Sequence, residues 1–378
     1  MMSFKNCLNW GRKPYRSELK AVEQVLKSGV LSGYRANWGY HYGGEYVQRL
    51  EKDFQDYFHV KHALAVSSAT AGLFLALKAY GIKEGDEVIT TPYTFSASAS
   101  CILMVGATPV FADIEAHTFN LNPLKVLLKV TDRTKAIIAV HLHGQSCDMD
   151  VLKNITNSCN LYLVEDAAQS LGATYRGQLA GTIGDIGVFS FNQWKPINSG
   201  EGGMVVTNND SLAEAISLMR NHGEVYSNKP ILGYNFRMTE ITAAIALERF
   251  KNVDKVNNET IKLCEYMTQR IYDRFTPELL PPYVMPDCKH TYYTYPIRLS
   301  NKVNRKELQG QMLAQGTYMG GDYVKPLHLL PIFGGHEGEF PVAERMWSKE
   351  IMVTNVVKSP LQLKSIDDII KKIGIALS

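Results

Sequence analysis

The sequence has few cysteines and no long hydrophobic run, and each absence excludes a class of protein. Six cysteines are scattered along the 378 residues: Cys7, Cys101, Cys147, Cys159, Cys264 and Cys288. They form no CxxC pair and no cluster with histidine, so we expect free thiols in a reducing compartment and no metal site. No apolar run approaches the roughly 18 residues that a membrane-spanning helix needs.

The sequence also lacks a signal segment and a strong excess of charge. The amino terminus, MMSFKNCLNWGRKPY, has no apolar stretch of the secretory type, which predicts a cytoplasmic protein. The net charge is only +3, and the basic residues form no stripe, so we expect neither nucleic acid nor a membrane as a partner. With 45% hydrophobic residues, the composition is that of a soluble globular protein.

Short apolar runs of β type alternate with helical patterns from residue 62 onward. The candidate strands are 62–67, 86–91, 108–114, 135–141, 161–166, 186–191 and 203–208, and helical patterns at 69–81, 95–106 and 150–159 lie between them. Strands that are apolar on both faces and separated by helices predict an α/β fold with a parallel sheet covered on both sides.

Helical patterns dominate the chain after residue 210, over 210–222 and from 238 to about 275. A proline-rich break at 278–287 is followed by a smaller α+β segment, with a strand at 292–299 and helices near 304–315 and 365–377. We place a boundary between about 250 and 285, and we predict two domains, 1–255 and 256–378.

The candidate functional residues follow the predicted strands, because an open parallel sheet binds ligands at the carboxyl ends of its strands. Ser68-Ala69-Thr70 opens a helix after the first strand, where it suits a phosphate or a plain N-cap. Phe95 follows the second strand and could stack on a ligand or pack in the core. Asp166 ends the fifth strand, where a carboxylate could bind a ligand or cap a helix.

The sixth strand leads through Ser190 into FNQWKPINSGEGG (191–203), which places Lys195 between aromatic residues and glycines. This setting suits a lysine that meets a bulky group, and glycines let the main chain pass close to it. Pyridoxal 5′-phosphate requires a phosphate-binding turn, an aromatic ring, a carboxylate and a lysine, and the candidate residues supply all four. Its phosphate needs donors, its ring needs stacking, its ring nitrogen needs an anion, and its aldehyde needs an amine.

Four motifs identify a family resemblance that covers nearly the whole chain. They are SAT at 68–70, EDAAQ at 165–169, SFNQWKPINSGEGG at 190–203 and GYNFRM at 233–238. With these motifs in order, the sequence resembles the DegT/DnrJ/EryC1/StrS family of sugar aminotransferases. The resemblance implies fold type I architecture, with a mostly parallel central sheet flanked by helices and a smaller C-terminal α+β domain.

The resemblance also implies a role for each motif residue. Lys195 would carry pyridoxal 5′-phosphate, Asp166 would pair with its pyridinium nitrogen, and Gln169 would contact the side of the ring that bears the hydroxyl group. Phe95 would stack on the ring.

Further roles concern the phosphate. Ser68-Ala69-Thr70 and Ser190 would hold it within one subunit. Asn235 would reach the phosphate of the neighbouring subunit, which implies a homodimer with shared active sites.

The implied reaction moves an amino group from L-glutamate to a keto-deoxy sugar linked to a nucleoside diphosphate, in the biosynthesis of amino sugars for surface polysaccharide or glycoconjugates. Members of the superfamily with histidine at the lysine position are dehydratases, so Lys195 favours transamination. Asp322, Tyr323 and His328 are candidate substrate contacts, and they fit a solvated turn equally well. Departures from the family pattern at 319–328 and 354–361 leave the sugar, its nucleotide and the aminated carbon open.

Two other functions remain open at this point. The acceptor could be a cyclitol or another cyclic ketone, or the protein could be a non-catalytic regulator on the same fold. The intact set of Lys195, Asp166 and Gln169 counts against the regulator. His141 and His143 follow a strand, where they could line the pocket or be hydrogen-bonded structural residues.

Overall fold

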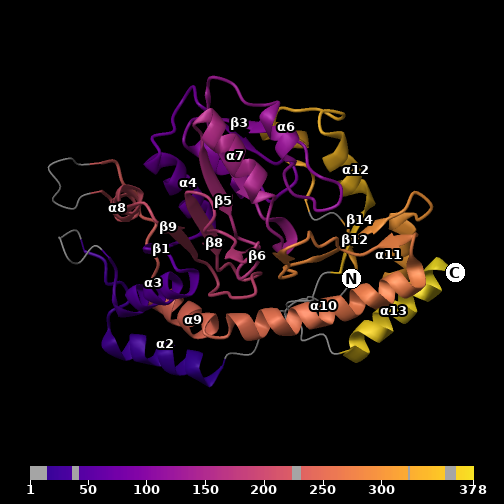
Figure 1. Ribbon diagram of the computed structural model, residues 1–378. Helices are drawn as coiled ribbons and strands as arrows, with labels where there is room; N and C mark the ends of the chain where they lie inside the picture. Colours follow the sequence, from indigo (N-terminus) through magenta and orange to yellow (C-terminus); the bar gives the residue numbers. More distant parts are fainter. Residues whose placement is uncertain (1–14, 36–41, 224–230, 322–323, 354–362) are drawn as a thin grey trace.

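The computed structural model describes residues 15–35, 42–223, 231–321, 324–353 and 363–378 (Figure 1). Its centre is a seven-stranded sheet in the order β1-β9-β8-β5-β4-β2-β3. The strands are β1 (His62–Val66), β2 (Glu87–Thr90), β3 (Thr108–Phe111), β4 (Thr134–Val140), β5 (Tyr162–Asp166), β8 (Ile186–Ser190) and β9 (Gly203–Thr207). All seven coincide with predicted strands, so the α/β fold is confirmed.

The sheet is mostly parallel, with one reversed strand. Strands β3, β2, β4, β5 and β8 run parallel, whereas β9 is antiparallel to both β8 and β1. The reversal follows from the connection, because the loop 191–202 joins β8 to β9 without the helix that a parallel crossover requires. Two reversals restore the direction, so β1 and β8 end at the same edge of the sheet.

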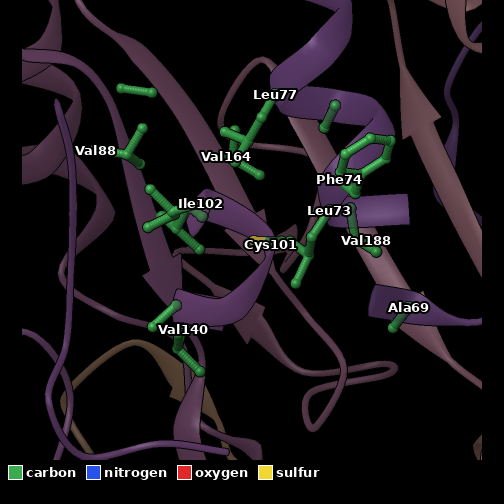
Figure 2. Packing of buried hydrophobic residues seen from close by; sticks show 14 of the residues in the cluster. Ala69, Leu73, Phe74, Leu77, Val88, Cys101, Ile102, Val140, Val164 and Val188 are labelled. Atoms are coloured by element: carbon green, nitrogen blue, oxygen red, sulfur yellow. The ribbon is translucent and has the colours of Figure 1, made fainter. Parts of the chain in front are cut away.

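Apolar side chains alternate between the two faces of the strands, and helices cover both faces. On one face, α4 (Ala69–Ala79) and α5 (Ala97–Met104) pack on residues such as Val88, Val140, Val164 and Val188 (Figure 2). Helix α8 (Asp210–Met219) belongs to the same hydrophobic cluster. On the other face lie α3 (Glu45–Phe58) and α9 (Glu240–Phe250), with α6 (Pro123–Leu127) and α7 (Met149–Cys159) beside them. Helix α2 (Arg16–Ser28) packs on α9.

The predicted long helix to residue 275 is two helices, α9 and α10 (Val253–Phe275), and α10 leads from the central sheet to the C-terminal elements (Figure 1). These form an antiparallel sheet in the order β10-β12-β14-β13. Its strands are β10 (Leu279–Leu280), β12 (Tyr295–Leu299), β13 (Gly320–Gly321) and β14 (Glu350–Val353). Helices α11 (Arg305–Ala314) and α13 (Leu363–Leu377) share a separate hydrophobic cluster with α10 and this sheet. The domain boundary after residue 255 stays a prediction, and α10 runs across it.

The C-terminal elements are tied to the central sheet by helix α12 (Pro341–Lys349). Its first N–H groups, those of Val342 and Ala343, donate to the carboxylate of Asp113 at 3.0 and 2.9 Å. A carboxylate at a helix N-terminus is stabilised by the helix dipole. Short elements complete the fold: β6 (Thr174–Tyr175), β7 (Gln178–Leu179), β11 (Cys288–Lys289), and the 3-10 helices η1 (Leu142–Gly144), η2 (Leu327–Leu329) and η3 (Pro331–Phe333). In the described parts of the chain, no helix has both the length and the apolar character needed to cross a membrane.

Candidate active site

Strand pairing brings two of the predicted phosphate segments together. Gly203, the first residue of β9, pairs with Val66 of β1 on one side and with Ser190 of β8 on the other. The turn that follows Val66 and the end of β8 therefore lie next to one another at the carboxyl edge of the sheet. This neighbourhood depends on the reversed direction of β9.

The turn 67–70 ends in the N-terminus of α4. Ser68 is the N-cap, and its Oγ accepts a hydrogen bond from the N–H of Ala71 at 3.1 Å, so the N-cap interpretation is correct. That bond leaves the first two N–H groups, those of Ala69 and Thr70, outside the helical ladder. N–H groups at a helix N-terminus, together with the helix dipole, suit an anion. Both uses of the motif are thus compatible.

The glycines before β9 serve two different purposes. Gly200 (φ +90°) and Gly202 (φ +145°) adopt left-handed backbone conformations that other residues avoid. Gly203 allows a close approach instead. A Cβ atom at Gly203 would lie 2.7 Å from the main-chain N of Ala69 and 2.7 Å from the carbonyl carbon of Ser68. The main chain at Gly203 therefore passes close to the candidate phosphate turn, whereas its predicted close approach to a cofactor stays a prediction.

Asp166 is the buried last residue of β5, and its carboxylate is held at both oxygens. Oδ2 accepts from the hydroxyl of Ser98 at 2.7 Å, and Oδ1 accepts from the N–H of Ala168 at 3.1 Å. The residues that follow form a turn, so no helix begins there for Asp166 to cap. Asp166 is therefore a fixed, buried carboxylate at the carboxyl edge of the sheet, and its contact with a cofactor stays a prediction.

The neighbouring acid, Glu165, has a structural role. Its fully buried carboxylate accepts from the N–H groups of Gly181, Ile183 and Gly184 at 2.5–2.7 Å. It also accepts from Nε2 of His141 at 2.7 Å, while Nδ1 of His141 accepts from the N–H of Cys147. His141 is therefore the hydrogen-bonded structural histidine that was one of its two interpretations.

Gln169 is buried, and the direction of its amide is set by the loop after β4. The main-chain N–H of His143 donates to Oε1 of Gln169 at 3.0 Å. This bond assigns the oxygen end of the amide to the His143 N–H, so the nitrogen end is the one that donates hydrogen bonds. The contact of Gln169 with the cofactor stays a prediction.

Lys195 lies in the loop between β8 and β9, half-buried, between the buried side chains of Phe191 and Ile197. Its Nζ lies 4.3 Å from the ring centroid of Tyr293, which precedes β12. Within the described residues, the ammonium group forms no ion pair with a carboxylate. The amino group is therefore held by an aromatic face and not by a carboxylate.

Phe95 follows Pro92 and Tyr93 in the loop between β2 and α5, and 61% of its surface is exposed. The neighbouring Tyr93 is fully buried, so the two aromatic residues differ in their surroundings. Core packing thus accounts for Tyr93, whereas the ring of Phe95 has the exposure that stacking on a ligand requires.

Asn235 is exposed, and its Oδ1 accepts from Nε of Arg237 at 2.9 Å. The surrounding segment runs beside the phosphate turn of its own chain, where the N–H of Ser67 donates to the carbonyl of Phe236 at 2.8 Å. The contact of Asn235 with a neighbouring subunit stays a prediction.

The predicted substrate residues are only partly described. Asp322 and Tyr323 lie outside the described residues. His328 is buried, with Nε2 3.0 Å from Oε1 of Glu344 and its ring edge-on to Phe340. These contacts favour a packed structural histidine over a direct substrate contact.

A sequence profile of the DegT/DnrJ/EryC1/StrS aminotransferase family matches residues 16–374. The chain belongs to this family. The resemblance carried by the four motifs is confirmed, and so is the assignment as a pyridoxal-phosphate-dependent aminotransferase of fold type I.

Several known proteins are similar to this chain over most of its length. Identity to the spore coat polysaccharide biosynthesis protein SpsC of Bacillus subtilis (strain 168) is 35% over 381 residues, 95% of this chain and 94% of that protein. Identity to the GDP-perosamine synthase of Caulobacter vibrioides is 40% over 296 residues, 76% of this chain and 78% of that protein. The X-ray structure of the aminotransferase from Psychrobacter cryohalolentis superposes with a TM-score of 0.88 at 29% identity, covering 97% of this chain and 98% of that one.

The cofactor of the family, pyridoxal 5′-phosphate, fits the residues at the carboxyl edge. The N-terminus of α4 and Ser190 offer donors for a phosphate, and the carboxylate of Asp166 offers a fixed anion for a ring nitrogen. Lys195 would contribute an amine, and Phe95 an exposed ring. Gly203 removes the one Cβ atom that would press on the phosphate turn.

Two residues of the site were missed by the sequence interpretation of this aminotransferase. Tyr293 sits in the run YYTYPIRL, where an aromatic residue looks like any other strand residue. Ser98, which bonds to Asp166, sits in the small-residue helix pattern of 95–106. No local pattern marks either residue, because each acquires its role from a partner that is distant in the sequence.

Proposed function

We propose that this aminotransferase moves an amino group from L-glutamate to a keto-deoxy sugar linked to a nucleoside diphosphate. The names of two relatives support this acceptor, since one refers to a GDP-linked product and the other to polysaccharide biosynthesis. The product would be an amino sugar for a surface polysaccharide or glycoconjugate.

The observation that carries the proposal is the setting of Lys195. Its amine has no acid partner within the described residues, it lies against Tyr293, and its loop begins at Ser190, beside the phosphate turn. A structural lysine would gain more from a carboxylate or from water. An amine beside an anion-binding turn and a fixed carboxylate suits covalent catalysis on a phosphorylated cofactor.

When bound, pyridoxal 5′-phosphate supplies an electron sink for charge that develops on the substrate carbon. The chain's own residues hold and orient it. Lys195 would attach through Nζ and, once released, would move a proton at the substrate carbon. Asp166 would keep a proton on the ring nitrogen, and the NH₂ group of Gln169 would donate to the ring oxygen.

We also propose that the active unit is a homodimer with shared sites. Asn235 is exposed, which a contact across a subunit interface requires. In an isologous dimer each Asn235 would reach the site of the other subunit, so two identical sites would result.

The test is a panel of keto-sugar nucleotides, incubated with L-glutamate and followed by product mass, with Lys195→Ala as the inactive control. A mass shift for the replacement of a ketone oxygen by an amino group, only with active protein, is the expected result. Turnover of a free cyclic ketone such as a keto-cyclitol, with no turnover of any keto-sugar nucleotide, would refute the proposed acceptor. Cofactor binding without turnover of any ketone would instead favour the regulatory alternative.

A further inference from the structure

A chain of buried polar side chains joins the N-terminal helix α2 to the loop that carries Lys195. Its members are Glu18 in α2, Arg249 in α9 and Asn198 in the loop itself. Glu18 is 3% exposed and Asn198 is 8% exposed, and the side chain of Arg249 is 14% exposed. Polar groups buried in this way must satisfy one another, because little water reaches them.

Arg249 stands at the centre of this chain and donates to the residues on both sides. Its Nε lies 2.6 Å from Oε1 of Glu18. Its Nη1 donates to the carbonyl of Asn198 at 3.0 Å and also to Oδ1 of Asn198. The other oxygen of Glu18 accepts from the N–H of Tyr15 at 2.9 Å. Both oxygens of the buried carboxylate are therefore hydrogen-bonded, and the guanidinium group compensates its charge.

The chain ends on the main chain of Lys195. Nδ2 of Asn198 donates to the carbonyl of Lys195 at 3.1 Å. A guanidinium group can only donate hydrogen bonds, so the amide atom that faces Arg249 is the oxygen, and the nitrogen faces Lys195. Arg249 therefore fixes both the place of the Asn198 side chain and the direction of its amide.

Lys195 lies at the tip of its loop, beyond the bonds that close the base of the loop. At the base, the N–H groups of Phe191 and Gln193 donate to the carbonyls of Gly202 and Gly200 at 2.9 and 2.7 Å. Both glycines adopt conformations that other residues avoid, and glycine tolerates many alternatives. The position of the tip therefore depends on contacts with other parts of the chain.

Helix α9 supplies such contacts. Ile197 is buried in the same hydrophobic cluster as Phe250 of α9, and Asn198 bonds to Arg249 of the same helix. Apolar packing has no preferred direction, whereas a hydrogen bond does. The bonds from Arg249 to Asn198, and from Asn198 to the carbonyl of Lys195, therefore orient the main chain from which the lysine side chain extends.

We propose that Arg249 is a positioning residue, which holds Asn198 and thereby places the amine of Lys195 for attachment to pyridoxal 5′-phosphate. The proposal rests on the assignment of Lys195 as the residue that carries the cofactor. In the attachment, Nζ forms a bond to the aldehyde carbon, and the two protons of the amine leave with the aldehyde oxygen as water. Arg249 touches no reacting atom, so its effect falls on this attachment and not on the rest of the pocket.

The experiment compares two forms of the cofactor. Pyridoxal 5′-phosphate can join Lys195, whereas pyridoxamine 5′-phosphate has an amino group in place of the aldehyde and occupies the pocket without that bond. The dissociation constants of both compounds are measured for the wild type and for the double variant Glu18→Leu/Arg249→Met. This variant removes both buried charges together, a replacement that is often neutral for stability.

We expect the double variant to lose affinity for one compound only. Without Arg249 the tip takes other positions, so the dissociation constant of pyridoxal 5′-phosphate should rise at least about tenfold. The constant of pyridoxamine 5′-phosphate should change by less than about twofold, because it needs no placed amine. Asn198→Asp keeps an acceptor for Arg249 but cannot donate to Lys195, and it should show the same selective loss even if the double variant does not fold.

The matched control is Glu87→Leu/Arg133→Met, which removes another ion pair with a buried carboxylate, at the amino end of β2. Both of its dissociation constants should equal those of the wild type. Wild-type affinity of the folded double variant Glu18→Leu/Arg249→Met for pyridoxal 5′-phosphate would overturn the proposal. An equal loss for both compounds would do the same, because it would show general support of the pocket. So would a loss that is absent from Asn198→Asp, because the effect would not pass through Asn198.

Lys195→Ala separates these outcomes from failure of the site assignment. If this variant leaves both the affinity for pyridoxal 5′-phosphate and the visible absorption unchanged, the lysine itself is misassigned. If it alters them while Asn198→Asp and the double variant bind both compounds as the wild type does, only the positioning role of Arg249 is refuted.

Discussion

Replacing Gly203 by alanine should weaken cofactor binding through the phosphate turn. The added Cβ would lie 2.7 Å from Ala69 N and Ser68 C, and 2.9 Å from Phe189 O, which are all main-chain atoms. An ordinary contact needs at least 3.4 Å, so the turn must retreat by about 0.7 Å. Overpacking of this kind costs about 1–3 kcal/mol. If the whole cost lowers the free energy of cofactor binding, the dissociation constant of the cofactor rises roughly 5- to 150-fold.

The assay is equilibrium binding of pyridoxal 5′-phosphate, compared with pyridoxal, which lacks the phosphate. The loss for Gly203→Ala should be several-fold smaller for pyridoxal, because the displaced turn faces only the phosphate. Gly310→Ala is the control, since a Cβ there meets nothing within 4 Å and the position lies inside α11. It should leave affinity unchanged and stabilise the protein by up to about 1 kcal/mol. A folded Gly203→Ala protein with wild-type affinity for pyridoxal 5′-phosphate would refute the role given to this turn.

The remaining predictions concern the residues with assigned roles. Lys195→Ala should abolish both the visible absorption of the reconstituted protein and its turnover, and full activity in that variant would end the assignment. Asp166→Asn should lower the turnover number on the order of 100-fold or more while cofactor occupancy changes less, and an unchanged turnover number would make Asp166 purely structural. Mixed dimers of Lys195→Ala and Asn235→Ala subunits should regain part of the activity, because one site in each heterodimer is intact. No recovery after demonstrated subunit exchange would place Asn235 in its own subunit's site.

The positions of the strands were predictable because each central strand is apolar on both faces and ends in a turn. The direction of β9 was not, since an apolar strand has the same side-chain pattern in either direction. That direction matters, because it places Gly203 between Val66 and Ser190. Helix α3 was also missed, although its buried Tyr46, Val47, Leu50, Phe54 and Phe58 have helical spacing. Its first residues lie in the Tyr- and Gly-rich stretch 33–46, which does not look helical.

The candidate site divides in the same way. Lys195, Asp166 and Gln169 lie in short motifs that can be recognised locally. The sequence does not distinguish Glu165 from Asp166 as a candidate ligand-binding acid. In the structure, the carboxylate of Glu165 accepts from three main-chain N–H groups and from His141. The pairing of His143 with Glu350 has no local signature, because the two residues are brought together only when the C-terminal sheet packs against the central one.

The pairing of Gly203 with Val66 on one side and Ser190 on the other also affects the order of events in folding. The phosphate turn is next to its strand neighbours only after β9 has paired with both β1 and β8, and β1 is far from β9 in the sequence. Such non-local pairings form slowly, because the entropy cost of closing a long loop comes before the stabilising contacts are made. A nascent chain in which only β1 and α4 have been synthesised thus contains the phosphate turn but lacks Gly203 and Ser190 beside it. Cofactor capture should therefore report the late joining of β9, and it would stabilise only chains that have completed that step.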